Sequence, residues 1–201
     1  MKTVYLIPVF ALLLCTACGP GKPGDASARS IPEPDIVERL HVQKKEIEER
    51  FRSEPFRILL YTKTTAYGIP RLVTDDFPEE MHTMYEILTD DEGRMICAWE
   101  FPMISAGEWN ISYIHYFDES GHTFAFERQC SFLNSRCTPG VAREVRTEFF
   151  NGSFQMVDRE YELVDAQNKP LQKGDCVFPF NFIYQASSDT GEYLKANKIR
   201  R

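Results

Sequence analysis

The chain has 201 residues, of which 43% are hydrophobic and 26% charged, and its 23 Lys and Arg against 30 Asp and Glu leave a formal net charge of −7 at pH 7. This is the composition of an ordinary globular protein, so it excludes a disordered, collagen-like or coiled-coil chain. The negative balance opposes phosphate backbones, so we expect no nucleic-acid partner.

The first eighteen residues have the pattern of an export signal. Lys2 and the free amino group form a short positive start, and Val4 to Leu14 is an uncharged, apolar run. A membrane-spanning helix needs about 20 apolar residues, so this run is too short to cross a bilayer and is typical of a signal-peptide core. Two small residues, Thr16 and Ala17, then precede Cys18.

Leu14, Thr16, Ala17 and Cys18 resemble the lipobox of bacterial lipoproteins. The resemblance covers residues 1–18 and implies that the signal is cut before Cys18, which then carries acyl chains such as palmitate. It therefore implies a bacterial envelope protein whose partner is a membrane, reached through a lipid anchor at Cys18. Gly19, in place of the Asp that keeps many such proteins in the inner membrane, indicates the outer membrane. An ordinary secretory peptide cut near Ala17 is the alternative.

The composition changes sharply after the signal. Residues 19–34 (GPGKPGDASARSIPEP) are mostly Pro, Gly, Ser and Ala, with almost nothing to bury. Such a segment is typical of a flexible tether. Residues 35–201 are long enough for one hydrophobic core, so we expect a single globular domain there.

Four cysteines lie in this domain, an even number that suits an exported protein. Cys130 and Cys137 flank a six-residue loop, and a hairpin would bring them together. By elimination, Cys97 would then bond to Cys176. The alternative is that some or all of the thiols stay reduced and buried. No Cys-x-x-Cys occurs outside the signal, so we expect neither a metal nor another cofactor.

The domain begins with a helical pattern. Asp35 stands three residues before Glu38 as a capping box, and Pro55 ends the pattern. Ile36, Leu40, Ile47 and Phe51 form an apolar stripe at helical spacing. The pairs Glu46–Arg50 and Glu48–Arg52 are expected on the solvated side. We predict an amphipathic helix of about twenty residues that packs on the core.

After Pro55 the period of the pattern changes to two. Residues 56–63 predict a first strand, and three hairpins then follow with the turn sequences D-D-E-G, D-E-S-G and N-G. The expected strands are 84–89, 94–101, 110–117, 122–132, 143–150, 153–157 and a last strand, Cys176–Tyr184. The fold class is therefore α+β: an N-terminal amphipathic helix followed by a curved antiparallel meander of about seven or eight strands.

Alternation along these strands predicts one heavily aromatic face and one polar face. In the middle hairpin, Ile114 and Tyr116 are the apolar exceptions on the polar face. One helix about 10 Å wide covers only two or three strands, so most of the aromatic face would curl over, bind something or stay uncovered. The residues expected to face a ligand are Tyr113, His115, Phe117, His122, Phe124 and Phe126.

No motif specifies a reaction. His115 and His122 share the predicted aromatic face, but histidines on such a face are more often core residues than metal ligands. The sequence contains no Gly-x-Ser-x-Gly, no His-Glu-x-x-His and no glycine loop of the phosphate-binding type. We therefore expect no enzyme and no catalytic residue.

The first functional hypothesis is an envelope-anchored, non-catalytic module that binds a protein or a ligand on the sheet. The alternative is a carrier of an apolar ligand, such as a lipid or acyl chain, in a half-barrel lined by aromatic residues. An envelope hydrolase ranks last. A cavity of about 300 Å³ or more on the aromatic face would favour the carrier.

Overall fold

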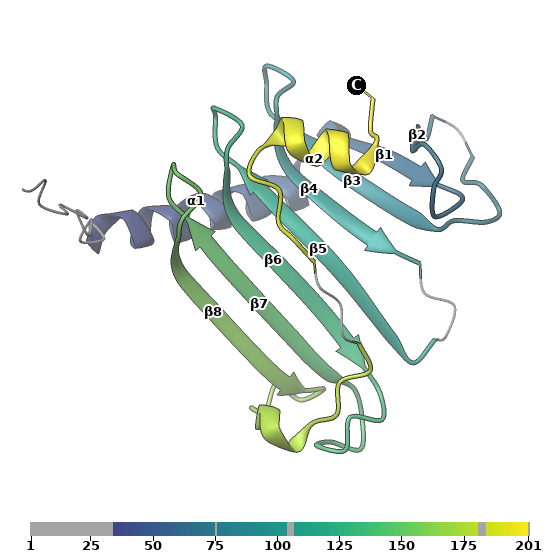
Figure 1. The fold of residues 1–201 in the computed structure, drawn as a ribbon, viewed down its shortest axis with the longest axis vertical. Coiled ribbons are helices and arrows are strands. Elements are labelled where there is room, and N and C mark those ends of the chain that lie inside the picture. Colours follow the sequence, from purple (N-terminus) through teal and green to yellow (C-terminus); the bar gives the residue numbers. More distant parts are fainter. Residues whose placement is uncertain (1–33, 75, 104–106, 181–183, 201) are drawn as a thin grey trace, which may run out of the picture. The chain divides into compact units, whose positions relative to one another are not determined.

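An eight-stranded antiparallel sheet in the order β2-β1-β3-β4-β5-β6-β7-β8 forms the centre of the computed structural model (Figure 1). The strands are β1 (Ile58–Lys63), β2 (Arg71–Leu72), β3 (Thr83–Thr89), β4 (Met95–Pro102), β5 (Trp109–Phe117), β6 (Thr123–Phe132), β7 (Ala142–Phe150) and β8 (Met156–Asp165). The helices are α1 (Pro34–Ser53) and α2 (Thr190–Asn197), with short 3-10 turns η1 (Pro55–Arg57) and η2 (Lys173–Asp175). The predicted antiparallel meander is confirmed.

The structure describes residues 34–74, 76–103, 107–180 and 184–200. The signal peptide, Cys18 and residues 19–33 of the expected tether lie outside the described residues. Neither helix in the described part is long and apolar enough to cross a membrane.

Two of the hairpin turns share one hydrogen-bonding pattern. In the β3–β4 turn the carboxylate of Asp90 accepts hydrogen bonds from the backbone N–H groups of Glu92 and Arg94. Asp118 accepts in the same way from Ser120 and His122 in the β5–β6 turn. An Asp side chain that mimics the backbone in this manner favours a tight turn, which is why neighbouring strands pair in sequence order.

Helix α1 covers one face of the sheet. Leu40 and Ile47 of its stripe are buried, and Ile36 and Phe51 pack partly buried beside them. Their partners include Ile114 and Tyr116, together with Leu88, Cys97 and Phe149. The helix thus packs on the face that is mostly polar by sequence alternation. It contacts that face at Ile114 and Tyr116, the two apolar exceptions.

The C-terminal residues cover the opposite, aromatic face. Phe178, Phe180 and Tyr184 pack against a cluster that contains Tyr113 and Phe126. Helix α2 adds Tyr193, which is fully buried with residues of β1, β3, β4 and β5. Figure 1 shows α1 behind the sheet, and α2 with the C-terminal segment in front of it. We call residues 170–180 and 184–199 the C-terminal cover. The sequence leaves three outcomes open for most of this face, and in the structure residues of the C-terminal cover pack on it.

Three local predictions from the sequence differ from the structure. The segment expected as the strand Cys176–Tyr184 forms no strand in its described residues, and residues 181–183 lie outside the description. Residue Phe124 lies in the cluster beneath α1 and not on the aromatic face. The reason is a bulge between Tyr116 and Phe117, which shifts the register so that His115 pairs with Phe126. Strand β2 and helix α2 were not expected.

The disulfide pairing also differs from the expectation. Cys137 bonds to Cys176, whereas Cys97 and Cys130 are free and buried. The predicted pairs Cys130–Cys137 and Cys97–Cys176 are therefore wrong. The physical reason is that Cys130 lies within β6 with its side chain in the aromatic-face core. Cys137 lies in the following loop, near the C-terminal cover.

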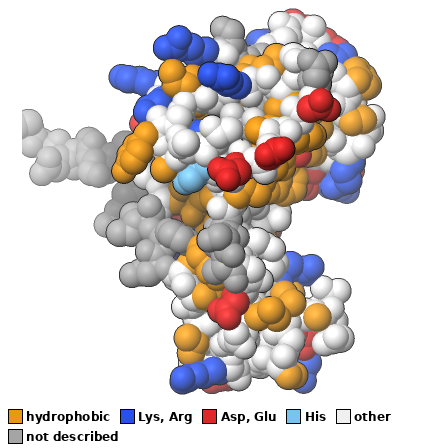
Figure 2. Space-filling view, turned by 90° about the vertical axis from the view of Figure 1, so that its right-hand side faces the viewer, with side chains coloured by type: hydrophobic (Ala, Val, Ile, Leu, Met, Phe, Trp, Pro, Cys, Tyr) orange, Lys and Arg blue, Asp and Glu red, His pale blue; other side chains and the backbone are white. Residues whose placement is uncertain are grey.

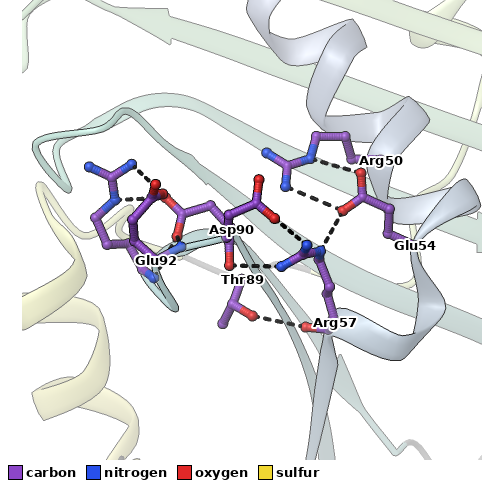
Figure 3. Close-up of polar contacts among 8 residues, drawn as sticks. Arg50, Glu54, Arg57, Thr89, Asp90 and Glu92 are labelled. Atoms are coloured by element: carbon purple, nitrogen blue, oxygen red, sulfur yellow. Dashed lines mark hydrogen bonds and ion pairs between the residues drawn. The ribbon is translucent and has the colours of Figure 1, made fainter.

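A network of charged side chains joins the end of α1 to the β3–β4 turn (Figure 3). Arg57 lies 2.9 Å through its Nε from Glu54 Oε2, donates to the carbonyl oxygen of Asp90, and pairs with the Asp91 carboxylate. Arg50 donates to the other oxygen of Glu54. These contacts fix the direction in which the chain leaves α1 and enters β1.

Candidate functional site

A cleft of about 260 Å³ lies between the C-terminal half of α1 and the sheet. We call it the α1 cleft. It is lined by Glu48, Phe51 and Arg52 of α1, Cys97 and Trp99 of β4, Ile114 and Tyr116 of β5, and Gln129 of β6. Its size is just below the roughly 300–1,000 Å³ of ordinary small-molecule sites.

The walls of the cleft are mainly apolar. The rings of Phe51 and Trp99 are 5.3 Å apart between centroids, and Trp99 stacks on Phe101 at 5.1 Å. Ile114 and Cys97 are buried on the sheet side. An apolar ligand group placed here would leave water, which is the dominant favourable contribution to binding at such a site.

We call the side of the cleft formed by Glu48, Tyr116 and Gln129 its inner end, and a hydrogen-bonded ion network joins these residues to Lys44 and Glu127. Lys44 Nζ is 2.6 Å from Glu48 Oε1 and 2.7 Å from Glu127 Oε2. Tyr116 donates its hydroxyl hydrogen to Glu48, and Gln129 Nε2 donates to Glu127. Burial alone would lower the pKa of Lys44, but the carboxylates of Glu127 and Glu48 outweigh burial and raise it. The network therefore keeps Lys44 charged and holds the sheet side of the cleft in one arrangement.

Two donors of the residues that line the cleft have no partner within the described residues. The indole Nε1 of Trp99 is buried without a hydrogen-bond acceptor. Among the residues that the structure describes, the exposed guanidinium of Arg52 forms no ion pair or hydrogen bond. The expected pair Glu48–Arg52 is therefore not formed, since Glu48 is held by Lys44, and Arg50 pairs with Glu54 in place of Glu46.

The residues expected to face a ligand do not line this cleft. Tyr113, His115, Phe117 and Phe126 are all at most 7% exposed and lie in clusters or ring contacts beneath the C-terminal cover. Phe124 is buried beneath α1. His122 is the exposed member of the set and lies near Asp118 in the β5–β6 turn. These six residues therefore do not form one open surface.

The histidine and cysteine candidates on the aromatic face have shifted pKa values or differ in exposure. Burial lowers the pKa of His115 to about 3, and His115 and His122 differ completely in exposure. Burial likewise raises the pKa of Cys130 to about 12. In the described residues, no group of three or more His, Cys, Asp or Glu side chains is arranged to hold a metal ion.

Sequence reasoning missed Trp99, Glu48 and Gln129 as members of one site. They come from three different elements, and only the path of α1 across the sheet brings them together. The usable signal was the pair of apolar exceptions, Ile114 and Tyr116, which mark where a second element packs on the polar face.

A second hollow lies at the β2 edge of the sheet. It has a volume of about 580 Å³ and includes Thr62, Gly68 and Arg71. Figure 2 looks onto this side and shows hydrophobic side chains interspersed with charged ones. Tyr67, Ile69, Leu72 and Phe77 are large hydrophobic residues exposed in this region of the chain.

Comparison with known proteins gives no match: no family model, no curated protein and no solved structure resembles the chain. The function must therefore be argued from the site itself.

Proposed function

We propose that this protein is a lipoprotein of the bacterial cell envelope, anchored to the outer membrane through acylated Cys18. Its domain acts as a non-catalytic binding module, and the α1 cleft receives a small ligand. The anchoring rests on the lipobox-like residues 14–18.

The observation that supports binding is that the α1 cleft has open apolar walls beside polar groups that are already paired. Its walls leave apolar space open, while the ion network of Lys44, Glu48 and Glu127 beneath it is already satisfied. A preorganised site of this kind loses little conformational entropy when a ligand enters. The aromatic face, where a carrier would hold its ligand, is instead filled by the C-terminal cover, so we place the ligand on the opposite face.

Two isoleucines of β5 allow a matched test of ligand binding. Ile114 lines the cleft, whereas Ile111 is buried on the opposite face. We would produce the full chain in a bacterial host and record native mass spectra before and after lipid extraction. An extractable added mass is expected for the wild type and for Ile111→Phe, and it should be lost in Ile114→Phe.

Thermal unfolding of both variants shows whether they are folded, because overpacking each site costs about 1–3 kcal/mol. No extractable mass in the wild type, or a mass that persists in folded Ile114→Phe, would overturn the proposed binding.

Substitution of Cys18, with substitution of Cys15 as the control, tests the anchor. Cys18→Ser should abolish labelling by radioactive palmitate and move the protein out of the membrane fraction, whereas Cys15→Ser should leave both unchanged. Unlabelled wild-type protein, or labelling that survives Cys18→Ser, would overturn the proposed anchor.

A further inference from the structure

We propose that the α1 cleft selects a medium-chain carboxylate, with the apolar chain between Phe51, Trp99 and Ile114 and the carboxylate at Arg52. This inference rests on the proposed binding function and goes further by naming the chemical class of the ligand. It follows from which polar groups of the cleft are already paired and which are not.

The donors of the inner end are already used. The hydroxyl of Tyr116 and the ammonium of Lys44 both contact Glu48 Oε1, and the amide nitrogen of Gln129 donates to Glu127. A ligand would have to break these bonds to use the same donors. The inner end therefore does not supply the selectivity for a charged headgroup.

Two donors of the lining residues lack a protein partner in the part of the chain that the structure describes. Trp99 Nε1 is a buried N–H with no acceptor, and Arg52 is a cation without an ion pair among the described residues. A buried donor without an acceptor is unfavourable, so an arriving acceptor would be stabilised. A carboxylate has two acceptor oxygens and matches the planar guanidinium of arginine.

The other charges at the cleft do not reverse this preference. Glu48 is the one acidic residue that lines it, and its carboxylate is held at 2.6 Å by the Lys44 ammonium. Lys44 is in turn shared with Glu127. Lys44 therefore offsets one of these two carboxylates, and the charge of Arg52 brings the sum over the four groups to zero, so the preference for a carboxylate depends on its contact with Arg52.

The volume limits the size of the chain. A cleft of 260 Å³ is just below the roughly 300–1,000 Å³ of ordinary small-molecule sites. We therefore take octanoate, a short acyl chain, as the probe, because a long-chain acyl group would extend out of the cleft.

Trp99 provides a spectroscopic probe within the site. The chain has two tryptophans, and Trp109 lies near Phe180 on the opposite side of the sheet. In a Trp109→Phe variant the fluorescence reports Trp99 alone. We would titrate this variant at pH 7 with octanoate, octanol and octylamine, which share a chain and differ in the charge of the headgroup.

Octanoate should change the Trp99 emission saturably and bind about tenfold more tightly than octanol, with octylamine weakest. Arg52→Gln should reduce octanoate affinity to that of octanol and leave octanol unchanged. Arg39→Gln removes the same charge from an exposed position of α1 outside the cleft and should change neither affinity.

Each other result contradicts a specific statement. If octanol binds as tightly as octanoate and Arg52→Gln has no effect, the carboxylate preference is wrong while binding in the cleft stands. If none of the three changes the emission, the carboxylate class is wrong. Native mass spectrometry of the same preparation then shows whether the binding function fails as well.

Discussion

His115 shows how burial sets the chemistry of a single residue. Its side chain is fully buried, and its Nε2 accepts a hydrogen bond from the backbone N–H of Ser187 at 3.1 Å. The proton of the neutral ring therefore lies on Nδ1, which has no partner among the described residues. Burial disfavours the imidazolium form and lowers the pKa of His115 to about 3.

This pKa makes the stability of the protein sensitive to acid. The unfolded chain binds a proton at His115 below about pH 6.5, whereas the folded protein does not until about pH 3. Stability is therefore fully present above pH 6.5 and falls as the pH is lowered. Between pH 7 and pH 5 we expect His115 to cost about 2 kcal/mol of unfolding free energy.

The variant His115→Gln tests this, because the amide oxygen of Gln can still accept from Ser187. Urea unfolding at pH 7 and pH 5 should show a smaller loss on acidification in the variant than in the wild type. Equal losses in the two proteins would show that other groups dominate the acid response.

Lys44 and Glu127 form the most deeply buried ion pair beneath α1, with side chains 13% and 4% exposed. We predict that Lys44→Met destabilises the protein by about 3 kcal/mol, because it leaves the Glu127 carboxylate buried without a cation. Urea unfolding measures the change, with Lys45→Met as control. Lys45 is the exposed neighbour, and its replacement should change stability by no more than about 0.5 kcal/mol.

A second variant separates a charge effect from a packing effect. Adding Glu127→Gln to Lys44→Met removes the uncompensated carboxylate, so the double variant should be more stable than Lys44→Met alone. Equal stability of the two variants would assign the loss to packing.

At the scale of elements, the disulfide holds the C-terminal cover. Cys137 and Cys176 are 39 residues apart and join the β6–β7 loop to the segment that contributes Phe178 and Phe180. We predict that the double variant Cys137→Ser/Cys176→Ser loses about 3 kcal/mol of stability, since a closed loop of this length restricts the unfolded chain. Calorimetry with and without a reducing agent measures it.

In that experiment, reduction should bring the wild type to the melting temperature of the double variant and leave the variant unchanged. Cys130→Ala, which removes a buried free thiol, should retain the sensitivity to reduction. A wild type that melts at the same temperature in both conditions would argue against a stabilising bond.

A helix or strand can be predicted from the sequence when the residues that indicate it lie close together in the chain. Turns with Asp or Asn that bonds its own backbone mark the hairpins within a few residues, so the meander could be predicted. Alternation in residues 176–180 correctly indicates one-sided burial, because Phe178 and Phe180 pack while Val177 and Pro179 are exposed. It does not indicate strand pairing, because alternation reports burial and not hydrogen bonds.

The C-terminal helix had a weaker signal. Asp189 caps α2 by accepting from the N–H of Glu192, and Glu192 in turn accepts from the N–H of Ser188. This spacing resembles a capping box, but eight residues give little helical periodicity to support it. The α1 cleft could not be predicted, because no local pattern indicates how α1 crosses β4, β5 and β6.

For the whole molecule, the two faces of the sheet are covered by segments from opposite ends of the chain. Helix α1 supplies an apolar stripe for one face, and the C-terminal cover supplies aromatic rings for the other. The contacts of the cover join residues far apart in sequence, as between Tyr113 and Tyr184, whose ring centroids are 3.9 Å apart. Completion of the core therefore requires the last residues of the domain.

A truncation tests this dependence. We predict that a chain ending at Leu171, with Cys137→Ser to remove the unpaired thiol, exposes the aromatic face and associates. Size-exclusion chromatography should show oligomers, and a dye that binds apolar surface should bind strongly. The full-length Cys137→Ser/Cys176→Ser variant is the control, because it keeps the cover without its covalent bond and should remain monomeric. If the truncated chain is also monomeric and melts at the control's temperature, the cover contributes no essential part of the core, and the aromatic face is stable in water by itself.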